Sequence, residues 1–258
     1  MSDHVVIPWR IESRYPYNPT GDFPLPPATT LLEPLTALAL VAGVTERAQL
    51  GTSVLVLPHR HPVLAAKMLA TLDHLAPGRV VLGAGVGWMR EEIELLGVPH
   101  HRRGAWSDEA IRIMRECWKN ERASYKGEFF TFEPVACRPA PAHGTIPIWI
   151  GGHTPQALRR VVALGDGWHA AFPTPAKLEE ALVKLRQECQ RAGRALDTLT
   201  ISARVGLGAR RPSADMLTEV RALRDLGVEH VILEPAARDL ETMVGAIERF
   251  ASDVRGRL

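Results

Sequence analysis

This 258-residue chain lacks an excess of charge of either sign, because its 31 lysines and arginines are nearly balanced by 29 aspartates and glutamates. The net charge of +2 gives none of the clustered basic surface that a nucleic-acid-binding protein needs to displace counterions from phosphates. Long apolar runs are also missing. The most apolar run, residues 35–44, is about half of the roughly 20 residues that cross a bilayer. The sequence therefore predicts neither a nucleic-acid partner nor a membrane span.

Cysteine is scarce as well, because the chain has three, Cys117, Cys137 and Cys189, which are far apart in sequence. An odd number at such spacing indicates neither a disulfide framework nor a zinc site, and it suits a reducing compartment. No basic segment followed by an apolar stretch opens the chain, so no secretion signal is recognised. We expect a cytoplasmic protein with no metal site.

What the sequence does have is an alternation of short apolar runs with longer amphipathic ones. The predicted strands are 50–57, 79–84, 146–150, 166–171, 199–205 and 230–233. The predicted helices among them are 31–41, 63–75, 155–164, 176–192, 214–226 and 240–254. Repeated strand-then-helix units predict an α/β fold with a parallel sheet covered by helices, either doubly wound or closed into a barrel.

One segment interrupts this alternation. Between the strands that end near 84 and begin near 146, the pattern predicts two helices, 89–96 and 109–118, and then a hairpin over 125–132. We interpret residues 97–140, approximately, as an insertion at the carboxyl edge of the sheet, where loops carry function. The first thirty residues are rich in proline, tyrosine and arginine and predict a long loop.

A glycine-rich turn, Gly83-Ala84-Gly85-Val86-Gly87-Trp88, follows one strand and opens a helix. Its spacing is GxGxG, whereas the dinucleotide fingerprint is GxGxxG and is followed by an acidic residue about 20 positions on. A tight turn that uses glycine for room is one reading. We favour another, in which missing side chains let the backbone approach a planar ring.

A second motif is Ile148-Trp149-Ile150-Gly151-Gly152-His153-Thr154-Pro155. Thr154 is suited to cap a helix whose first residue is Pro155, a position where proline is tolerated. The paired glycines before a helix N-terminus also suit an approaching phosphate. An ordinary capped helix and a phosphate site both remain open.

Histidines supply the candidate acid–base groups. His4 follows Asp3 directly, and an imidazole exchanges protons near pH 7; a solvated terminal histidine is the alternative. His59 and His61 flank Arg60, but a metal pair there has no third ligand at matching spacing, so a rigid loop is favoured. The segment 100–103, His-His-Arg-Arg, is interpreted as a solvated polar turn.

The motifs together resemble a known family. SDHVVIPW (2–9), GTSVLVLPHRHP (51–62), LATLDHLAPGRVVLGAGVGWMREE (69–92) and PIWIGGHTPQALRRVVALGDGWH (147–169) occur in the order seen in the luciferase-like monooxygenase superfamily. They are most similar to its actinobacterial branch that uses the deazaflavin coenzyme F420. The resemblance covers nearly the whole chain and implies a single (β/α)8 TIM barrel over residues 1–258, with an insertion and a cofactor at the C-terminal mouth.

The resemblance also implies roles for residues. Asp3 would lie beside the cofactor ring and His4 would be the catalytic acid–base group. A non-proline cis peptide would join Ser53 to Val54 behind the ring. The other implied cofactor contacts are Val86, Gly87 and Trp88 at the ring, and Gly151, Gly152, His153 and Thr154 at the phosphate. A homodimer is implied too.

Two departures from the family pattern qualify this. Sugar-phosphate dehydrogenases of the family have a glutamate where this chain has Trp88, which argues against a glucose-6-phosphate substrate. Six strand–helix units are counted where a closed barrel has eight, so we expect that the first unit and most of the second strand are missing, and that an N-terminally extended chain is more stable.

The resulting hypothesis is an oxidoreductase that transfers a hydride between coenzyme F420 and a small organic substrate. An FMN-dependent monooxygenase on the same fold is the first alternative. A non-catalytic flavin-binding barrel is the alternative of a different class.

Overall fold

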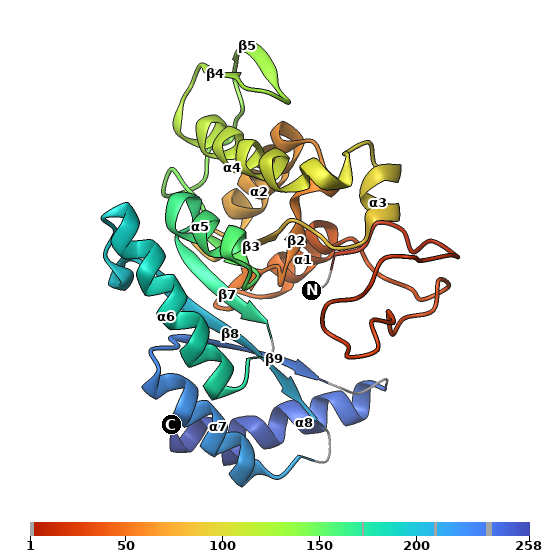
Figure 1. Cartoon of the computed structure of the whole chain (residues 1–258), viewed down its shortest axis with the longest axis vertical. Coiled ribbons are helices and arrows are strands. Elements are labelled where there is room, and N and C mark those ends of the chain that lie inside the picture. The colour runs from red at the N-terminus through yellow and green to blue at the C-terminus, as the bar shows by residue number, and fades with distance from the viewer. Residues whose placement is uncertain (1–2, 172, 209–210, 236–238) are drawn as a thin grey trace. The chain divides into compact units, whose positions relative to one another are not determined.

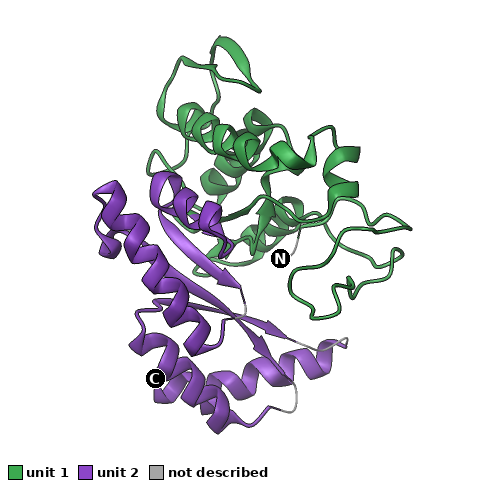
Figure 2. Ribbon diagram, in the orientation of Figure 1, with its two compact units in different colours: residues 1–148 green, residues 149–258 purple. Residues whose placement is uncertain are grey.

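A computed structural model describes residues 3–171, 173–208, 211–235 and 239–258. The chain divides into two compact units, Met1–Ile148 and Trp149–Leu258 (Figure 2). Strand β6, Ile148–Gly151, contains the boundary between them.

The first unit has parallel strands covered by helices. Its elements are α1 (Pro34–Val44), β1 (Leu50–Gly51), β2 (Leu55–Val56), α2 (Pro62–Leu75), β3 (Val80–Gly85), α3 (Arg90–Leu95), α4 (Arg103–Lys119), β4 (Ala123–Lys126) and β5 (Thr131–Val135). Both β1 and β2 pair with β3 in parallel, with Leu50 opposite Val80 and Leu55 opposite Ala84. Helix α2 packs on α1 and α4. The fully buried indole of Trp118 on α4 donates to the Ala66 carbonyl of α2 at 3.0 Å, which fixes these two helices against each other.

The hairpin of β4 and β5 lies at the outer end of this unit, beyond α4 (Figure 1). The buried carboxylate of Glu109 on α4 accepts the backbone N–H groups of Glu128 at 2.6 Å and Phe129 at 3.1 Å. A Cβ on Gly127 would come within 2.4 Å of that carboxylate, so the tip of the hairpin requires glycine there. The predicted hairpin is confirmed.

The second unit repeats strand and helix. Its elements after β6 are α5 (Pro155–Leu164), β7 (Gly167–Ala171), α6 (Pro175–Ala192), β8 (Thr200–Leu207), α7 (Ser213–Asp225), β9 (His230–Pro235) and α8 (Leu240–Asp253). β6, β7, β8 and β9 are neighbours in that order, and all pairs are parallel. Successive helices pack on one another along these strands (Figure 1). Leu207, Met216, Ala246 and Val254 form a buried cluster between β8, α7 and α8.

Helix ends in this unit follow from local sequence. The Thr154 and Thr174 hydroxyls accept the N–H groups of Ala157 and Lys177, and proline follows each threonine at the first helical position. Helix α6 ends at Ala192 and is capped by Gly193, whose φ of +64° favours glycine. These signals explain why the predicted helices 155–164 and 176–192 agree with α5 and α6 to within one residue.

Three predicted elements of the first unit differ from the structure. The strand predicted over 50–57 is two short strands, because the chain turns at residues 52–54. Helix α1 begins at Pro34, three residues later than predicted, where the Glu33 carboxylate accepts the N–H groups of the first turn. Helix α4 begins at Arg103, six residues before the predicted start, because the turn before it continues into the helix.

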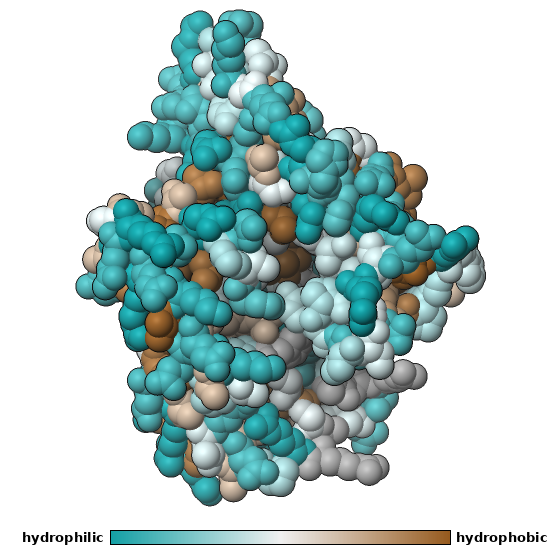
Figure 3. All heavy atoms as spheres, in the orientation of Figure 1, coloured by the Kyte–Doolittle hydropathy of each residue, from teal (hydrophilic) through white to brown (hydrophobic). Residues whose placement is uncertain are grey.

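No helix in the described ranges combines the length and apolarity that crossing a membrane requires. The side chains on the face drawn in Figure 3 are mostly hydrophilic, with scattered apolar residues.

Candidate active site

A buried ion pair holds the N-terminal segment against β2 in the first unit. The Asp3 carboxylate accepts hydrogen bonds from both terminal nitrogens of Arg60, at 2.6 and 2.8 Å, and from the Val56 N–H at 2.7 Å. Arg60 also donates to Glu33 at 2.7 Å, and its side chain is 9% exposed. Burial opposes the charge of Arg60, but hydrogen bonds and charges from the two carboxylates keep its pKa raised. Asp3 thus faces Arg60 and β2, and both of its oxygens are used within the protein.

The next residue, His4, is bound by a carboxylate that the motif analysis did not identify. Nδ1 of His4 lies 2.7 Å from Oε2 of Glu92 on α3, whose side chain is fully buried. The other Glu92 oxygen accepts the N–H groups of Val5 at 2.6 Å and Val6 at 3.1 Å. Burial alone would raise the pKa of Glu92, but the His4 hydrogen bond, nearby histidines and the backbone N–H groups lower it overall. An ionised carboxylate only accepts, so Nδ1 of His4 donates and Nε2 is the nitrogen that can gain or lose a proton.

His59 lies behind this pair. Its Nε2 is 3.6 Å from Glu92 Oε2 and its Nδ1 is 3.8 Å from Asp3 Oδ2, with only 2% of the side chain exposed. Nδ1 has no hydrogen-bond partner among the described residues. Burial lowers the pKa of His59, and the charges of Glu92 and Asp3 offset this only in part. Within the described ranges, no three His, Cys, Asp or Glu side chains are arranged to hold a metal.

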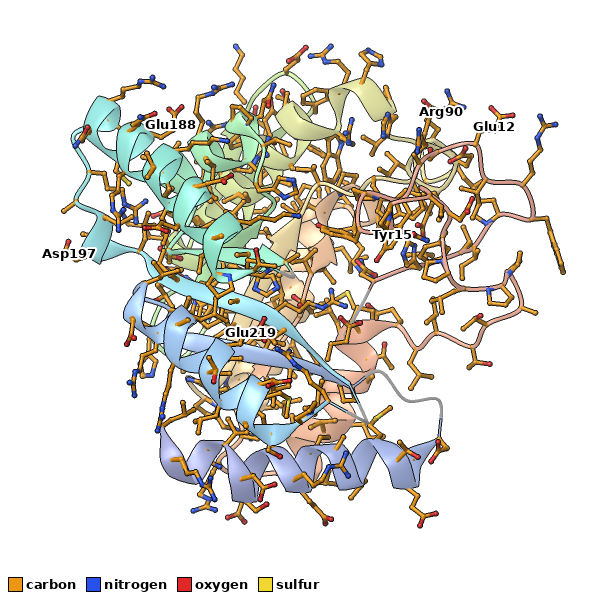
Figure 4. All side chains as sticks on the ribbon, turned by 60° about the horizontal axis from the view of Figure 1, so that its bottom comes forward. Glu12, Tyr15, Arg90, Glu188, Asp197 and Glu219 are labelled. Carbon is orange, nitrogen blue, oxygen red and sulfur yellow. The ribbon has the colours of Figure 1, made fainter. Side chains whose placement is uncertain are left out.

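Aromatic rings from the N-terminal loop and the glycine-rich turn surround His4. Its ring centroid lies 5.0 Å from Phe23 and 6.2 Å from Trp88, and Tyr15 lies 5.4 and 5.1 Å from those two rings. The loop is attached to α3 by the pair of Glu12 with Arg90, at 3.1 Å (Figure 4). The His4 side chain is 10% exposed as a result. The predicted long loop therefore shields the imidazole from water.

The peptide bond between Ser53 and Val54 is cis, as the resemblance implied. Ser53 is buried and Val54 is half-buried at the end of the segment between β1 and β2.

The glycine-rich turn packs closely on the same segment. A Cβ on Gly83 would lie 2.0 Å from the Thr52 carbonyl, and one on Gly85 would lie 2.6 Å from the Val54 side chain. Gly87 has a φ of +76°, and a Cβ there would lie 2.8 Å from Val56 and 2.9 Å from Ile93. The absence of side chains at these glycines lets the segment between β1 and β2 and the start of α3 pack closely against the turn. Packing within the protein therefore explains why the motif is rich in glycine. Val86, Gly87 and Trp88 are half-buried.

The segment 100–103 is only in part the solvated polar turn that the sequence suggested, because His101 is exposed but His100 and Arg103 are half-buried. Nε2 of His100 lies 3.2 Å from the Trp88 carbonyl, and Nε of Arg103 donates to the Gly87 carbonyl at 3.1 Å. Both side chains are therefore occupied in holding the main chain of the glycine-rich turn.

The predicted contacts to the cofactor phosphate belong to the second unit. Gly151 ends β6, and it and the following Gly152 are half-buried. His153 and Thr154 are exposed before α5. Gly152 has a φ of +106°, and a Cβ there would approach Ala157 to 3.1 Å. No side chain covers the main chain at the two glycines before this ten-residue helix. The N–H groups and the positive dipole at a helix N-terminus are suited to a phosphate group.

The second unit also has a buried histidine that the sequence analysis did not single out. Nδ1 of His169 on β7 and Oγ of Ser202 on β8 are hydrogen-bonded at 2.8 Å, and these two residues are opposite each other in the sheet. Burial, assisted by the charge of Arg204, lowers the pKa of His169 to about 4. This imidazole is neutral at physiological pH.

Glu92 is the main residue that motif reasoning missed, and a signal for it exists. Met89, Ile93 and Leu96 mark an apolar stripe with helical spacing, and Glu92 falls on that stripe. A carboxylate on a buried helical face requires partners. The spacing does not say that these partners come from residues 4–6.

The sequence matches a known protein family. Residues 15–253 match the family model described as luciferase-like monooxygenase. The chain belongs to the luciferase-like monooxygenase family. An uncharacterized protein of Mycobacterium tuberculosis strain H37Rv is 31% identical to this chain, over 98% of this chain and 87% of that protein.

Two further similar proteins have functional descriptions. The F420-dependent glucose-6-phosphate dehydrogenase of Nakamurella multipartita is 35% identical over 63% of this chain and 49% of its own length. A solved F420-dependent secondary alcohol dehydrogenase, in complex with an F420-acetone adduct, superposes with a TM-score of 0.78 at 16% identity. It covers 88% of this chain and 85% of its own. The predicted fold class, an α/β barrel of the luciferase-like type, is confirmed, and so is membership of an enzyme family.

Proposed function

We propose that this luciferase-like protein is an oxidoreductase that moves a hydride between coenzyme F420 and a small organic substrate, with His4 as its acid–base residue. The observation that carries the proposal is the bond of His4 Nδ1 to a buried, ionised carboxylate. A carboxylate stabilises the protonated imidazole and fixes the ring, so Nε2 is directed for proton exchange. The F420-dependent relative and structural neighbour support the choice of cofactor.

When bound, the deazaflavin would supply or accept the hydride, and the protein would orient the reactants. His4 would exchange a proton at Nε2 with the substrate. Tyr15, Phe23 and Trp88 would keep water away from that proton. The charge of Arg60 is compensated by Asp3 and Glu33 and is not available to a phosphate, so we propose an apolar substrate rather than a phosphorylated sugar.

Cofactor contacts follow from the same assignment. We propose that Ser53, Val54, Val86, Gly87 and Trp88 contact the ring system. Asp3 would act indirectly, by holding Arg60 and the Val56 N–H. The turn Gly151-Gly152-His153-Thr154 would bind the cofactor phosphate, because its glycines leave the main chain uncovered at the start of α5.

An FMN-dependent monooxygenase is the second candidate, and the description of the matching family supports it. A flavin-binding protein without catalysis is the third. Titration of the protein with F420 and with FMN, followed by fluorescence quenching, separates the first two. We expect saturable binding of F420 and weaker binding of FMN, and tighter binding of FMN would favour the monooxygenase.

A matched pair of variants tests the phosphate assignment. Gly152→Ala places a side chain at a φ of +106° in the proposed phosphate turn, and Gly193→Ala places one at +64° at the end of α6. We expect Gly152→Ala to weaken F420 binding about tenfold, or 1.4 kcal/mol, and Gly193→Ala to leave it unchanged. Equal affinities in the two variants would contradict the assignment.

We also propose a homodimer in a reducing compartment. All three cysteines are free and buried, which suits such a compartment. Sedimentation equilibrium tests the dimer.

A further inference from the structure

One carboxylate oxygen in the first unit faces two imidazoles. Oε2 of Glu92 lies 2.7 Å from Nδ1 of His4 and 3.6 Å from Nε2 of His59. The other oxygen of Glu92 is held by the N–H groups of Val5 and Val6, so the carboxylate has one oxygen for two histidines. The function proposed above uses His4 and gives His59 no part.

His59 has an environment that is unusual for a packing residue. Its side chain is 98% removed from solvent, and its Nδ1 has no hydrogen-bond partner among the described residues. A buried polar nitrogen without a partner is destabilising, so an apolar side chain of similar size would be more stable there. A histidine in such a position is better explained by a functional role than by a contribution to packing.

The charged and titratable groups that face His59 come from three parts of the chain. Glu92 comes from α3, Asp3 and His4 from the N-terminal segment, and Arg60 follows His59 in the chain. The two carboxylates attract a proton on His59, whereas burial, Arg60 and His4 oppose it. His59 is therefore neutral above its lowered pKa and becomes a cation between two carboxylates below it.

We propose that His59 is a positioning residue for His4, acting through the Glu92 oxygen that both imidazoles face. The neutral ring of His59 fills the space behind Glu92 and keeps its Oε2 directed at His4. A proton on His59 adds a positively charged donor that competes for the same oxygen and weakens the bond to His4. The proposal rests on the function assigned to His4, but the contacts that carry it do not involve a cofactor.

The test is a pH titration of the histidine Cε1–H signals by NMR, from about pH 5 to about pH 9, where imidazoles change charge. The protein is labelled with ¹³C-histidine, and the His4 and His59 signals are assigned by their loss in His4→Gln and His59→Gln. We expect the wild-type His4 signal to shift over the pH range in which the His59 signal titrates.

In His59→Gln the His4 signal should lose this shift. The matched control is His74→Gln on α2, where the histidine is exposed, and it should retain the shift. A wild-type His4 signal that does not move with the titration of His59, or a His4 signal that still moves over the same pH range in His59→Gln, would overturn the proposal. The wild-type result decides the matter even if His59→Gln does not fold.

Titrating the same samples with F420 separates this proposal from the proposed function. Loss of coupling with intact F420 binding removes only the role of His59. A coupled shift of His4 without F420 binding leaves the role of His59 standing and removes only the cofactor assignment.

Discussion

The two units each bury a histidine in a hydrogen bond of nearly the same length, and the partners make these histidines chemically different. His4 donates to the Glu92 carboxylate at 2.7 Å, whereas His169 is bonded to the Ser202 hydroxyl at 2.8 Å. The carboxylate compensates a positive charge on the ring. The hydroxyl does not, and burial lowers the pKa of His169 to about 4. His4 therefore has a partner that supports proton exchange, whereas burial keeps His169 neutral.

The largest effect expected from this comparison is a pH dependence of stability due to His169. Its pKa is about 4 in the folded state against 6.5 in the unfolded chain, so the unfolded chain takes up the proton first as pH falls. This stabilisation is complete above about pH 6.5 and is lost between there and about pH 4, by about 3 kcal/mol. Urea denaturation at several pH values should show His169→Asn losing less stability than the wild type over this range. Parallel losses would mean that His169 titrates normally.

Glu92→Gln should have the next largest effect. The amide keeps the shape of the side chain but removes the charge that His4 and two backbone N–H groups use. We expect a loss of about 2 kcal/mol in the free energy of unfolding. Glu94→Gln, on the same helix but exposed, is the control and should be neutral. If both variants unfold at the same urea concentration, the Glu92 carboxylate is not the centre of the network.

Ser202→Ala should have the smallest effect. It removes a neutral hydrogen bond from His169, which is worth about 1 kcal/mol. Thermal denaturation of this variant and of Ser124→Ala, where the serine is exposed, gives the comparison. A loss for Ser202→Ala as large as that for Glu92→Gln would show that the hydroxyl and the carboxylate act alike.

Much of the fold was predictable from the sequence, because β7, β8 and β9 are short apolar runs and α5 and α6 have clear caps. The division of the 50–57 strand was harder to predict. Its residues favour a strand throughout, yet the main chain between Thr52 and Val54 turns and fits against the glycines of β3.

The site was predictable only in part. The resemblance predicted roles for Asp3 and His4, and it predicted the cis peptide at Ser53, which the structure confirms. The partners of these residues were missed, because the His4–Glu92 bond spans 88 positions and no spacing rule reaches that far. His59 was considered only as a member of a metal pair with His61. Its role depends on a three-dimensional position between two carboxylates.

The most direct test of the account is the oxidation of reduced F420 by the wild type, His4→Gln and His169→Asn, with a panel of small ketones, enones and aldehydes. F420 binding is measured in the same samples. We expect the wild type and His169→Asn to turn over an acceptor, and His4→Gln to bind F420 normally while losing about a hundredfold or more in rate. A His4→Gln variant that turns over as fast as the wild type would contradict the assignment of His4 as the acid–base residue.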